Sequence, residues 1–166
     1  FHGCYFLESI ILNNGITAIE DHSFQYCKNL ASIIIPDSVK TIGKEAFDDC
    51  TSLVSVTLNE GITHIGDFTF RNCSNLQSIT LPESIVSIGK GAFEGCTSLT
   101  EFAFPASLET TGWSIFYECS NLHKLTVKKS SVDDEYGIYG TFNGASITSL
   151  VFADGVTTVS SALGLD

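Results

Sequence analysis

The hydrophobic positions of this chain recur at a constant interval of 23 residues. One row consists of phenylalanines: Phe1, Phe24, Phe47, Phe70, Phe93 and Phe116. Three residues after each stands a cysteine: Cys4, Cys27, Cys50, Cys73, Cys96 and Cys119. Six residues after each stands a leucine: Leu7, Leu30, Leu53, Leu76, Leu99 and Leu122. A period of this length indicates a repeat solenoid, in which each unit is too small to bury its own apolar face and packs on its neighbours.

The unit from Leu30 to Ser52 predicts the elements of one repeat. Residues 32–35 have strong β preference and alternate between outward and inward side chains, and the Pro36-Asp-Ser turn ends the strand. Gly43 suits a sharp corner that requires a positive φ. Phe47 and Cys50 follow at the spacing of one helical turn. The unit therefore reads as strand, corner and short helical turn.

Equivalent strands are expected in every unit, and corner glycines recur at Gly43, Gly66, Gly89 and Gly112. Copies of one strand at a constant interval can pair only in parallel and in register. We therefore expect one parallel sheet on the concave side of a right-handed superhelix, with short helical turns or loops on the other side. The expected strands are Ser9–Leu12, Ser32–Ile35, Ser55–Leu58, Ser78–Leu81, Glu101–Phe104, Lys124–Val127 and Ser149–Phe152.

The repeats predict a single solenoid over residues 1–166, with about seven units of which the last, 128–166, is irregular. In that unit Phe142 follows the preceding phenylalanine after 26 residues, and Ala145 takes the cysteine position. It is either a degenerate repeat or a bulged loop that offers a specific contact, and a tolerated surface insertion is the simpler alternative. Because the sequence begins and ends inside repeats without capping units, we interpret it as a fragment of a longer array.

The six cysteines raise the question of disulfides. Each falls at the same point of its repeat, beside an inward Phe and Leu, and free cysteine is a small, readily buried residue. We therefore expect a ladder of buried free thiols. Bridges between adjacent turns are the alternative, because neighbouring Cα atoms could fall within disulfide reach.

Composition and charge exclude some classes of partner. Hydrophobic residues make up 43% of the chain and charged residues 16%, which argues against disorder. Eight basic against 19 acidic residues give a formal charge of −11, which disfavours binding to nucleic acid and to anionic membrane surfaces. No apolar run approaches the roughly 20 residues of a spanning helix. We expect no nucleic-acid partner and no membrane insertion by this segment.

The sequence contains no convincing catalytic or metal-binding pattern. The four histidines are scattered without metal-type spacing, and the glycines from Gly89 to Gly95 lack the spacing of a phosphate loop. Buried cysteines would have no partner base to activate them. We therefore expect no enzymatic activity, no cofactor and no metal.

The outward strand positions are the first candidate binding surface, because solenoids often bind ligands on the concave side. These side chains are mostly small and weakly polar, so a plain solvated sheet face is the alternative. The candidate ligand-binding residues are Ser32, Ile34, Ser55, Thr57, Ser78, Thr80, Glu101 and Lys124.

Two further surfaces are candidates. Asp37, Glu60 and Glu83 stack after the strands, where they form either a solvated acidic edge or an incomplete set of Ca²⁺ ligands. Aromatic residues break the polar rule of their rows, and exposed aromatics can mark a contact or be exposed by chance. The aromatic candidates are Phe68, Trp113 and Tyr117, with Tyr26 as an additional member.

Two strings, Ile88-Gly-Lys-Gly-Ala-Phe93-Glu-Gly-Cys96-Thr-Ser-Leu99 and Ile79-Thr-Leu-Pro82, resemble the BspA-like, or Treponema-type, leucine-rich repeat. The resemblance covers essentially the whole chain. It implies a leucine-rich-repeat solenoid from a surface or secreted protein of a host-associated bacterium or protozoan. The asparagine ladder of commoner leucine-rich repeats is absent, because its positions hold Gly15, Ser38, Gly61, Ser84 and Ser107.

The resemblance implies a non-enzymatic interaction scaffold, extracellular or at the cell surface, that takes part in adhesion or ligand binding. Its expected partner is a protein or glycan ligand, with host extracellular matrix among the candidates. The alternatives are a structural spacer arm that presents other domains and an intracellular scaffold. The sequence does not fix the ligand or the oligomeric state.

Overall fold

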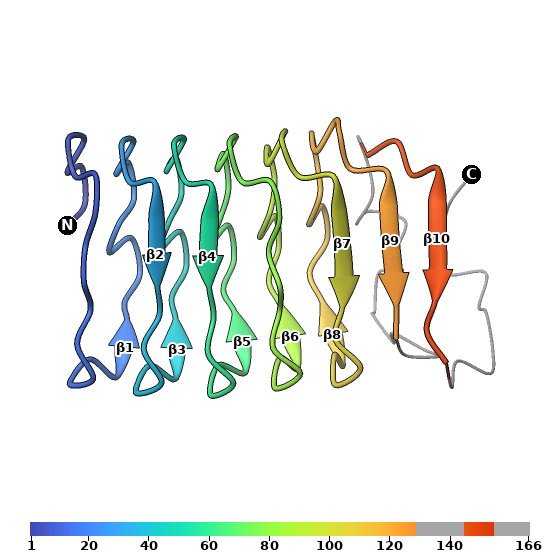
Figure 1. The fold of residues 1–166 in the computed structure, drawn as a ribbon, viewed down its shortest axis with the longest axis horizontal. Helices are drawn as coiled ribbons and strands as arrows, with labels where there is room; N and C mark the ends of the chain where they lie inside the picture. The colour runs from blue at the N-terminus through green and yellow to red at the C-terminus, as the bar shows by residue number, and fades with distance from the viewer. Residues whose placement is uncertain (129–144, 155–166) are drawn as a thin grey trace.

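The structure is a computed structural model that describes residues 1–128 and 145–154. The chain coils along one axis, and strands from successive turns lie side by side in parallel (Figure 1). The strands of the front row are β2 (Ser32–Ile34), β4 (Ser55–Thr57), β7 (Glu101–Phe104), β9 (Lys124–Val127) and β10 (Ser149–Phe152). This architecture confirms the predicted repeat solenoid.

The front strands pair in the register that the repeat predicts. Ser32 pairs with Ser55, Glu101 with Lys124, and Lys124 with Ser149. Each offset equals one repeat, or one repeat and its insertion. β10 lies within the irregular unit and confirms the strand expected there, whereas Phe142 and the rest of residues 129–144 and 155–166 lie outside the described residues.

Two of the expected strands, Ser9–Leu12 and Ser78–Leu81, are not strands in the structure, and that part of the prediction is wrong. The front row therefore consists of the pair β2–β4 and the triplet β7–β9–β10, separated by residues 78–81. In the described part of the chain, residues 78–81 make no backbone hydrogen bond to either neighbouring turn. The inward residues change here from Ile79 and Leu81 to the larger Phe102 and Phe104, and this size difference between turns opposes close ladder pairing.

A second parallel sheet corrects the expectation of a single sheet opposed by helical turns or loops. It is built from strands of two residues each, in the order β1–β3–β5–β6–β8. Ile19, Ile42, Ile65 and Ile88 point inward along this sheet and are buried. Its strands are β1 (Ala18–Ile19), β3 (Thr41–Ile42), β5 (His64–Ile65), β6 (Ser87–Ile88) and β8 (Thr110–Thr111), the short lower arrows of Figure 1.

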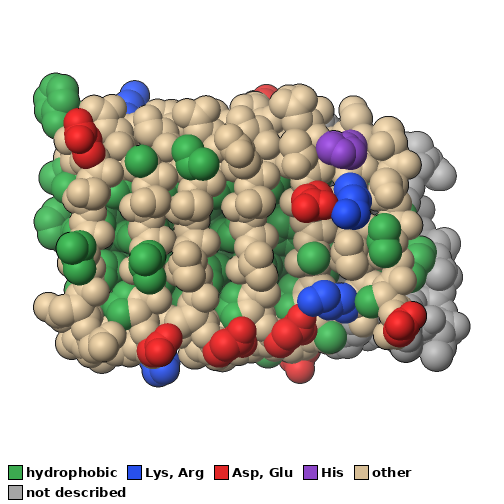
Figure 2. All heavy atoms as spheres, viewed as in Figure 1, with side chains coloured by type: hydrophobic (Ala, Val, Ile, Leu, Met, Phe, Trp, Pro, Cys, Tyr) green, Lys and Arg blue, Asp and Glu red, His purple; other side chains and the backbone are tan. Residues whose placement is uncertain are grey.

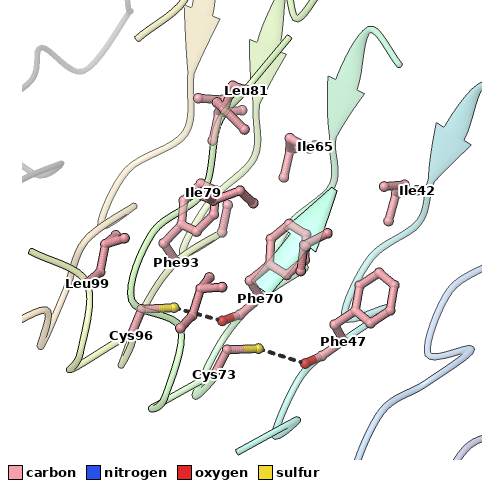
Figure 3. Close-up of a cluster of buried hydrophobic side chains, with 14 of the residues drawn as sticks. Ile42, Phe47, Ile65, Phe70, Cys73, Ile79, Leu81, Phe93, Cys96 and Leu99 are labelled. Atoms are coloured by element: carbon pink, nitrogen blue, oxygen red, sulfur yellow. Dashed lines mark hydrogen bonds between the residues drawn. The ribbon is translucent and has the colours of Figure 1, made fainter. Parts of the chain in front are cut away.

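Ladders of identical side chains fill the core (Figure 3). The rings of Phe24, Phe47, Phe70 and Phe93 stack with centroids 5.3–5.5 Å apart, and all four side chains are buried. Phe1 stacks on Phe24 but remains 66% exposed. The leucines from Leu30 to Leu122 are fully buried beside the rings. The predicted inward rows are therefore confirmed.

The cysteines form the predicted ladder of free thiols, and all except the half-buried Cys4 are buried. Each thiol from Cys27 onward donates a hydrogen bond to the carbonyl of a Phe in the preceding turn, with Sγ–O distances of 3.0–3.3 Å. Burial raises the pKa of Cys119 to about 12 and keeps the pKa of Cys73 well above its usual value. The thiols are therefore protonated structural donors.

The corners between the two sheets are tight turns, and the described residues contain no helix. The helix-like spacing of Phe47 and Cys50 corresponds to a turn in which Cys50 N donates to Phe47 O at 3.2 Å. Two positions per turn have positive φ, which a tight turn needs. One row is His22, Glu45, Phe68, Gly91 and Ser114, and the other is Gly3, Tyr26, Asp49, Asn72, Gly95 and Glu118.

The corner glycines are required for a different reason from the one predicted. Gly43, Gly66, Gly89 and Gly112 do not have positive φ. A Cβ on Gly112 would lie 2.2 Å from Lys90 N, and one on Gly66 would lie 2.9 Å from Gly43 C. Glycine is needed at these positions because the backbone of one turn lies directly against the backbone of the turn before it.

Candidate functional site

The outward side chains of the front row form one continuous surface, the strand face, which Figure 2 shows from the front. Every predicted ligand-binding residue lies on this face. Ile34 is 71% exposed, and Lys124 is half-buried. The other members are exposed: Ser32, Ser55, Thr57, Ser78, Thr80 and Glu101. The structure therefore brings all eight residues together on one side, across several turns.

The strand face is hollowed where residues 78–81 adjoin β7. This hollow has a volume of about 290 Å³. Ala103 is an outward residue there, and the equivalent positions of the neighbouring turns hold Thr80 and Thr126. The hydroxyl groups of Ser78, Thr80 and Thr126 have no hydrogen-bond partner among the described residues. The hollow therefore combines a small apolar residue with three available hydroxyl groups.

Two ion pairs flank the hollow, and Figure 2 shows them as two red and blue pairs over β7 and β9. Lys124 Nζ donates to Glu101 Oε2 at 2.8 Å, and Lys128 Nζ donates to Glu83 Oε1 at 2.5 Å. Glu83 Oε2 also accepts from Ala106 N at 2.8 Å. The lysine partners hold the pKa of both carboxyl groups below their ordinary value.

Sequence reasoning found part of this hollow. It placed Glu101, Lys124, Ser78 and Thr80 in the binding face but did not include Lys128. The pairing of Lys128 with Glu83 joins residues 45 positions apart, and nothing in the local sequence points to it. A usable signal was the break in the row of outward serines, which changes to Glu101 and Lys124 in two consecutive turns.

The acidic residues Asp37, Glu60 and Glu83 lie at the exposed edge after the front strands. Glu83 is paired with Lys128, and Lys40 Nζ donates to the main-chain carbonyl of Asp37 at 2.9 Å. In the portion of the chain that the structure describes, no group of three His, Cys, Asp or Glu side chains could hold a metal ion. Within the same ranges, no helix has the length and apolar character needed to cross a membrane.

The aromatic candidates lie at the corners, away from the strand face. Trp113 is 48% exposed and Tyr117 is 39% exposed, as expected for surface residues. Phe68 is only half-buried rather than exposed, because Arg71 and Lys90 lie 4.7 Å and 5.2 Å from its ring centroid. Lys90 Nζ also lies 3.6 Å from the ring centroid of Trp113. These rings therefore contact cations of the protein itself.

A buried charged cluster beneath the same corners was not predicted from the sequence. Asp48 is fully buried and accepts two hydrogen bonds from Arg71, at 2.8 Å and 2.7 Å, and one from Gln25 Nε2 at 2.8 Å. Glu45 accepts a further bond from Gln25 at 2.9 Å. The Asp48 carboxylate raises the pKa of Arg71 above its ordinary value. The cluster is satisfied internally, so its evident role is to hold neighbouring turns together.

Comparisons with known proteins agree with this architecture. The family model described as the BspA type leucine rich repeat region matches in six copies, over residues 1–123 and 41–163. A solved leucine-rich repeat protein of T. pallidum is 29% identical with a TM-score of 0.73, over 82% of this chain and 63% of that chain. No curated protein matches the chain.

Two further solved structures share the fold at lower identity. The pneumococcal vaccine antigen PcpA is 24% identical with a TM-score of 0.65, over 82% of this chain and 34% of that chain. A leucine rich cell surface protein from Faecalibacterium prausnitzii is 19% identical with a TM-score of 0.54, over 98% of this chain and 63% of that chain. The chain spans less than two thirds of the length of each of these three proteins.

Proposed function

This chain belongs to the BspA-type leucine-rich-repeat family, and on that premise we propose that it is a non-enzymatic scaffold that binds a protein or glycan ligand outside the cell. In this proposal the strand face is the binding surface, and the ligand belongs to a host extracellular matrix or another cell surface. Adhesion is the corresponding biological role.

The observation on which the proposal rests is the strand face itself. Its side chains project from turns that are fixed by stacked Phe, Leu and Cys ladders, so the surface is rigid before a ligand arrives. A rigid surface loses little conformational entropy on binding, which favours recognition by many weak contacts. Leucine-rich-repeat proteins generally act as interaction scaffolds, and this face is the extended surface that such a role requires.

The extracellular location has support from proteins of the same fold. One structural neighbour is described as a cell surface protein and another as a vaccine antigen. These descriptions belong to those proteins, with which this chain shares the fold at 19% and 24% identity. They make the cell exterior the first place to test, ahead of an intracellular scaffold.

Binding of the purified chain to immobilised matrix proteins and glycans, measured by biolayer interferometry, tests the proposal. Ser55→Arg and Thr57→Arg add bulk and charge to the strand face, and both should weaken binding by about tenfold or more, as hot-spot disruption typically does. Thr41→Arg, an exposed position on the second sheet, is the matched control and should leave binding unchanged.

The two alternatives predict different results. A structural spacer arm would show no binding by this chain, with ligand activity confined to other domains of a longer protein. An intracellular scaffold would bind cytoplasmic proteins but not matrix proteins or glycans. Equal loss of binding in Thr41→Arg and Ser55→Arg would mean that the strand face is not the ligand surface.

A further inference from the structure

The hollow on the strand face differs from the rest of that face in size and charge. Equivalent outward positions in neighbouring turns hold Thr57, Thr80 and Thr126, and Ala103 leaves room between them. This smaller side chain lies within the 290 Å³ hollow. A partner side chain can therefore enter here, whereas the neighbouring threonines fill the corresponding space in their own turns.

The accessible charge around the hollow is negative. The carboxylate side chains of Glu101 and Glu83 are 57% and 52% exposed, whereas those of their partners Lys124 and Lys128 are 43% and 37% exposed. The formal charge of the whole chain is −11, and Glu60 extends the acidic edge beside Glu83. A negative field of this kind attracts cationic partners and repels acidic ones.

The hydrogen-bonding groups around the hollow are mainly acceptors. Both oxygens of Glu83 are used, by Lys128 and by the amide of Ala106. Glu101 uses Oε2 for Lys124, and Oε1 has no partner among the described residues. The hydroxyl oxygens of Thr80 and Thr126 can also accept. A ligand with several donors in one plane would match this set.

We propose that the Ala103 hollow is a specificity pocket for an arginine side chain of a partner protein. The guanidinium donates to Glu101 Oε1 and to the neighbouring hydroxyl oxygens, while the methylene stem packs on Ala103 and the threonine methyl groups. Arginine is favoured over lysine because its planar group supplies five N–H donors in a fixed arrangement. This inference rests on the proposed role of the strand face and names the group that the face selects.

The test is an NMR titration of the 166-residue chain, labelled with ¹⁵N, with the blocked peptide acetyl-Gly-Ser-Arg-Ser-Gly-amide. Matched peptides carry lysine, citrulline or glutamate in place of arginine, and citrulline keeps the shape of arginine without its charge. We expect amide shifts confined to the turns around Ala103, and affinity in the order arginine, lysine, citrulline. Binding of a single side chain is weak, so the titration extends into the millimolar range.

Variants separate the pocket from general attraction. Ala103→Leu fills the hollow without changing the charge and should abolish the localised shifts. Glu101→Gln should weaken arginine binding about threefold to fivefold, the range of an exposed ion pair. Glu60→Gln removes the same charge outside the hollow and should change affinity by less than about 1.5-fold. Thermal melts of all three variants verify that they are folded.

Several results would overturn the inference. Equal weakening by Glu60→Gln and Glu101→Gln, or equal binding of the citrulline peptide, would leave only non-specific contact. Preferential binding of the glutamate peptide would assign recognition to the lysines, and absence of localised shifts would remove the pocket. If matrix binding is lost in Ser55→Arg but unaffected by Ala103→Leu, the proposed function stands and this pocket does not.

Discussion

Gly89 lies at a corner where two turns of the backbone meet, and replacing it with alanine tests how closely the solenoid is wound. A Cβ at this position would lie 2.5 Å from Asp67 N and 2.6 Å from Gly66 C. Both are backbone atoms, so the clash cannot be relieved by a side-chain rotation. The turns would have to separate, which would lengthen the 2.8 Å bonds from Gly89 N to Ile65 O and from Lys90 N to Asp67 Oδ1.

The expected cost follows from these contacts. Overpacking of a tight site costs about 1–3 kcal/mol, and each weakened hydrogen bond adds up to about 1 kcal/mol. Alanine also restricts the unfolded chain, which returns roughly 0.4–1 kcal/mol. We expect Gly89→Ala to lower the free energy of unfolding by about 2–3 kcal/mol, measured by urea denaturation followed by circular dichroism.

Two comparisons make the result decisive. Gly15→Ala is the matched control, because its Cβ would meet only the side-chain oxygen of Asn13 at 3.1 Å, and we expect a change within about 0.5–1 kcal/mol. Gly89→Asn separates close approach from backbone conformation, since asparagine tolerates positive φ. If Gly89→Asn is milder than Gly89→Ala, or if Gly89→Ala equals Gly15→Ala, the close-approach explanation is wrong.

Three further predictions address the core. Phe70→Ala removes a fully buried ring between two stacked neighbours and should cost about 3–5 kcal/mol in a thermal melt, whereas the largely exposed Phe1→Ala should cost far less. Arg71→Ala leaves the buried Asp48 carboxylate without its cation and should cost about 3 kcal/mol in urea denaturation; a loss below about 1 kcal/mol would contradict the buried pair. Cys73 and Cys96 should react with a thiol reagent only after unfolding. Because the pKa of the folded thiols lies above the unfolded value of 9.0, stability should fall as pH rises past about 9, and Cys119→Ala should reduce that fall.

The ladders could be predicted from the sequence because each repeated position reports the same environment several times. One Phe followed by Cys three residues later means little, but six copies at one spacing exclude coincidence. The same repetition fixed the parallel register, since only in-register turns place Phe47 on Phe70. Burial of Cys50 followed from its neighbours in the repeat rather than from its own chemistry.

The second sheet and the corners could not be predicted by the same reasoning. A strand of two residues such as Thr41–Ile42 is too short to show alternation, so it read as an isolated apolar position. Glycine at a corner is compatible with positive φ and with close approach, and the sequence alone does not separate them. The row Asp49, Asn72 and Gly95 did contain a signal, because these residue types are enriched at positive φ.

The candidate site depends on departures from the repeat, which is why its position was partly predictable and its chemistry was not. Glu101 and Lys124 replace the serines of other turns without altering any inward residue, so the change affects the surface alone. Ala103 in place of threonine removes a methyl and a hydroxyl group at the centre of that change. A substitution on an outward position of a solenoid costs little stability, so the array can alter one turn independently of the others. The charged and hollowed turns around β7 are therefore where a specific ligand contact can differ from the uniform face beside them.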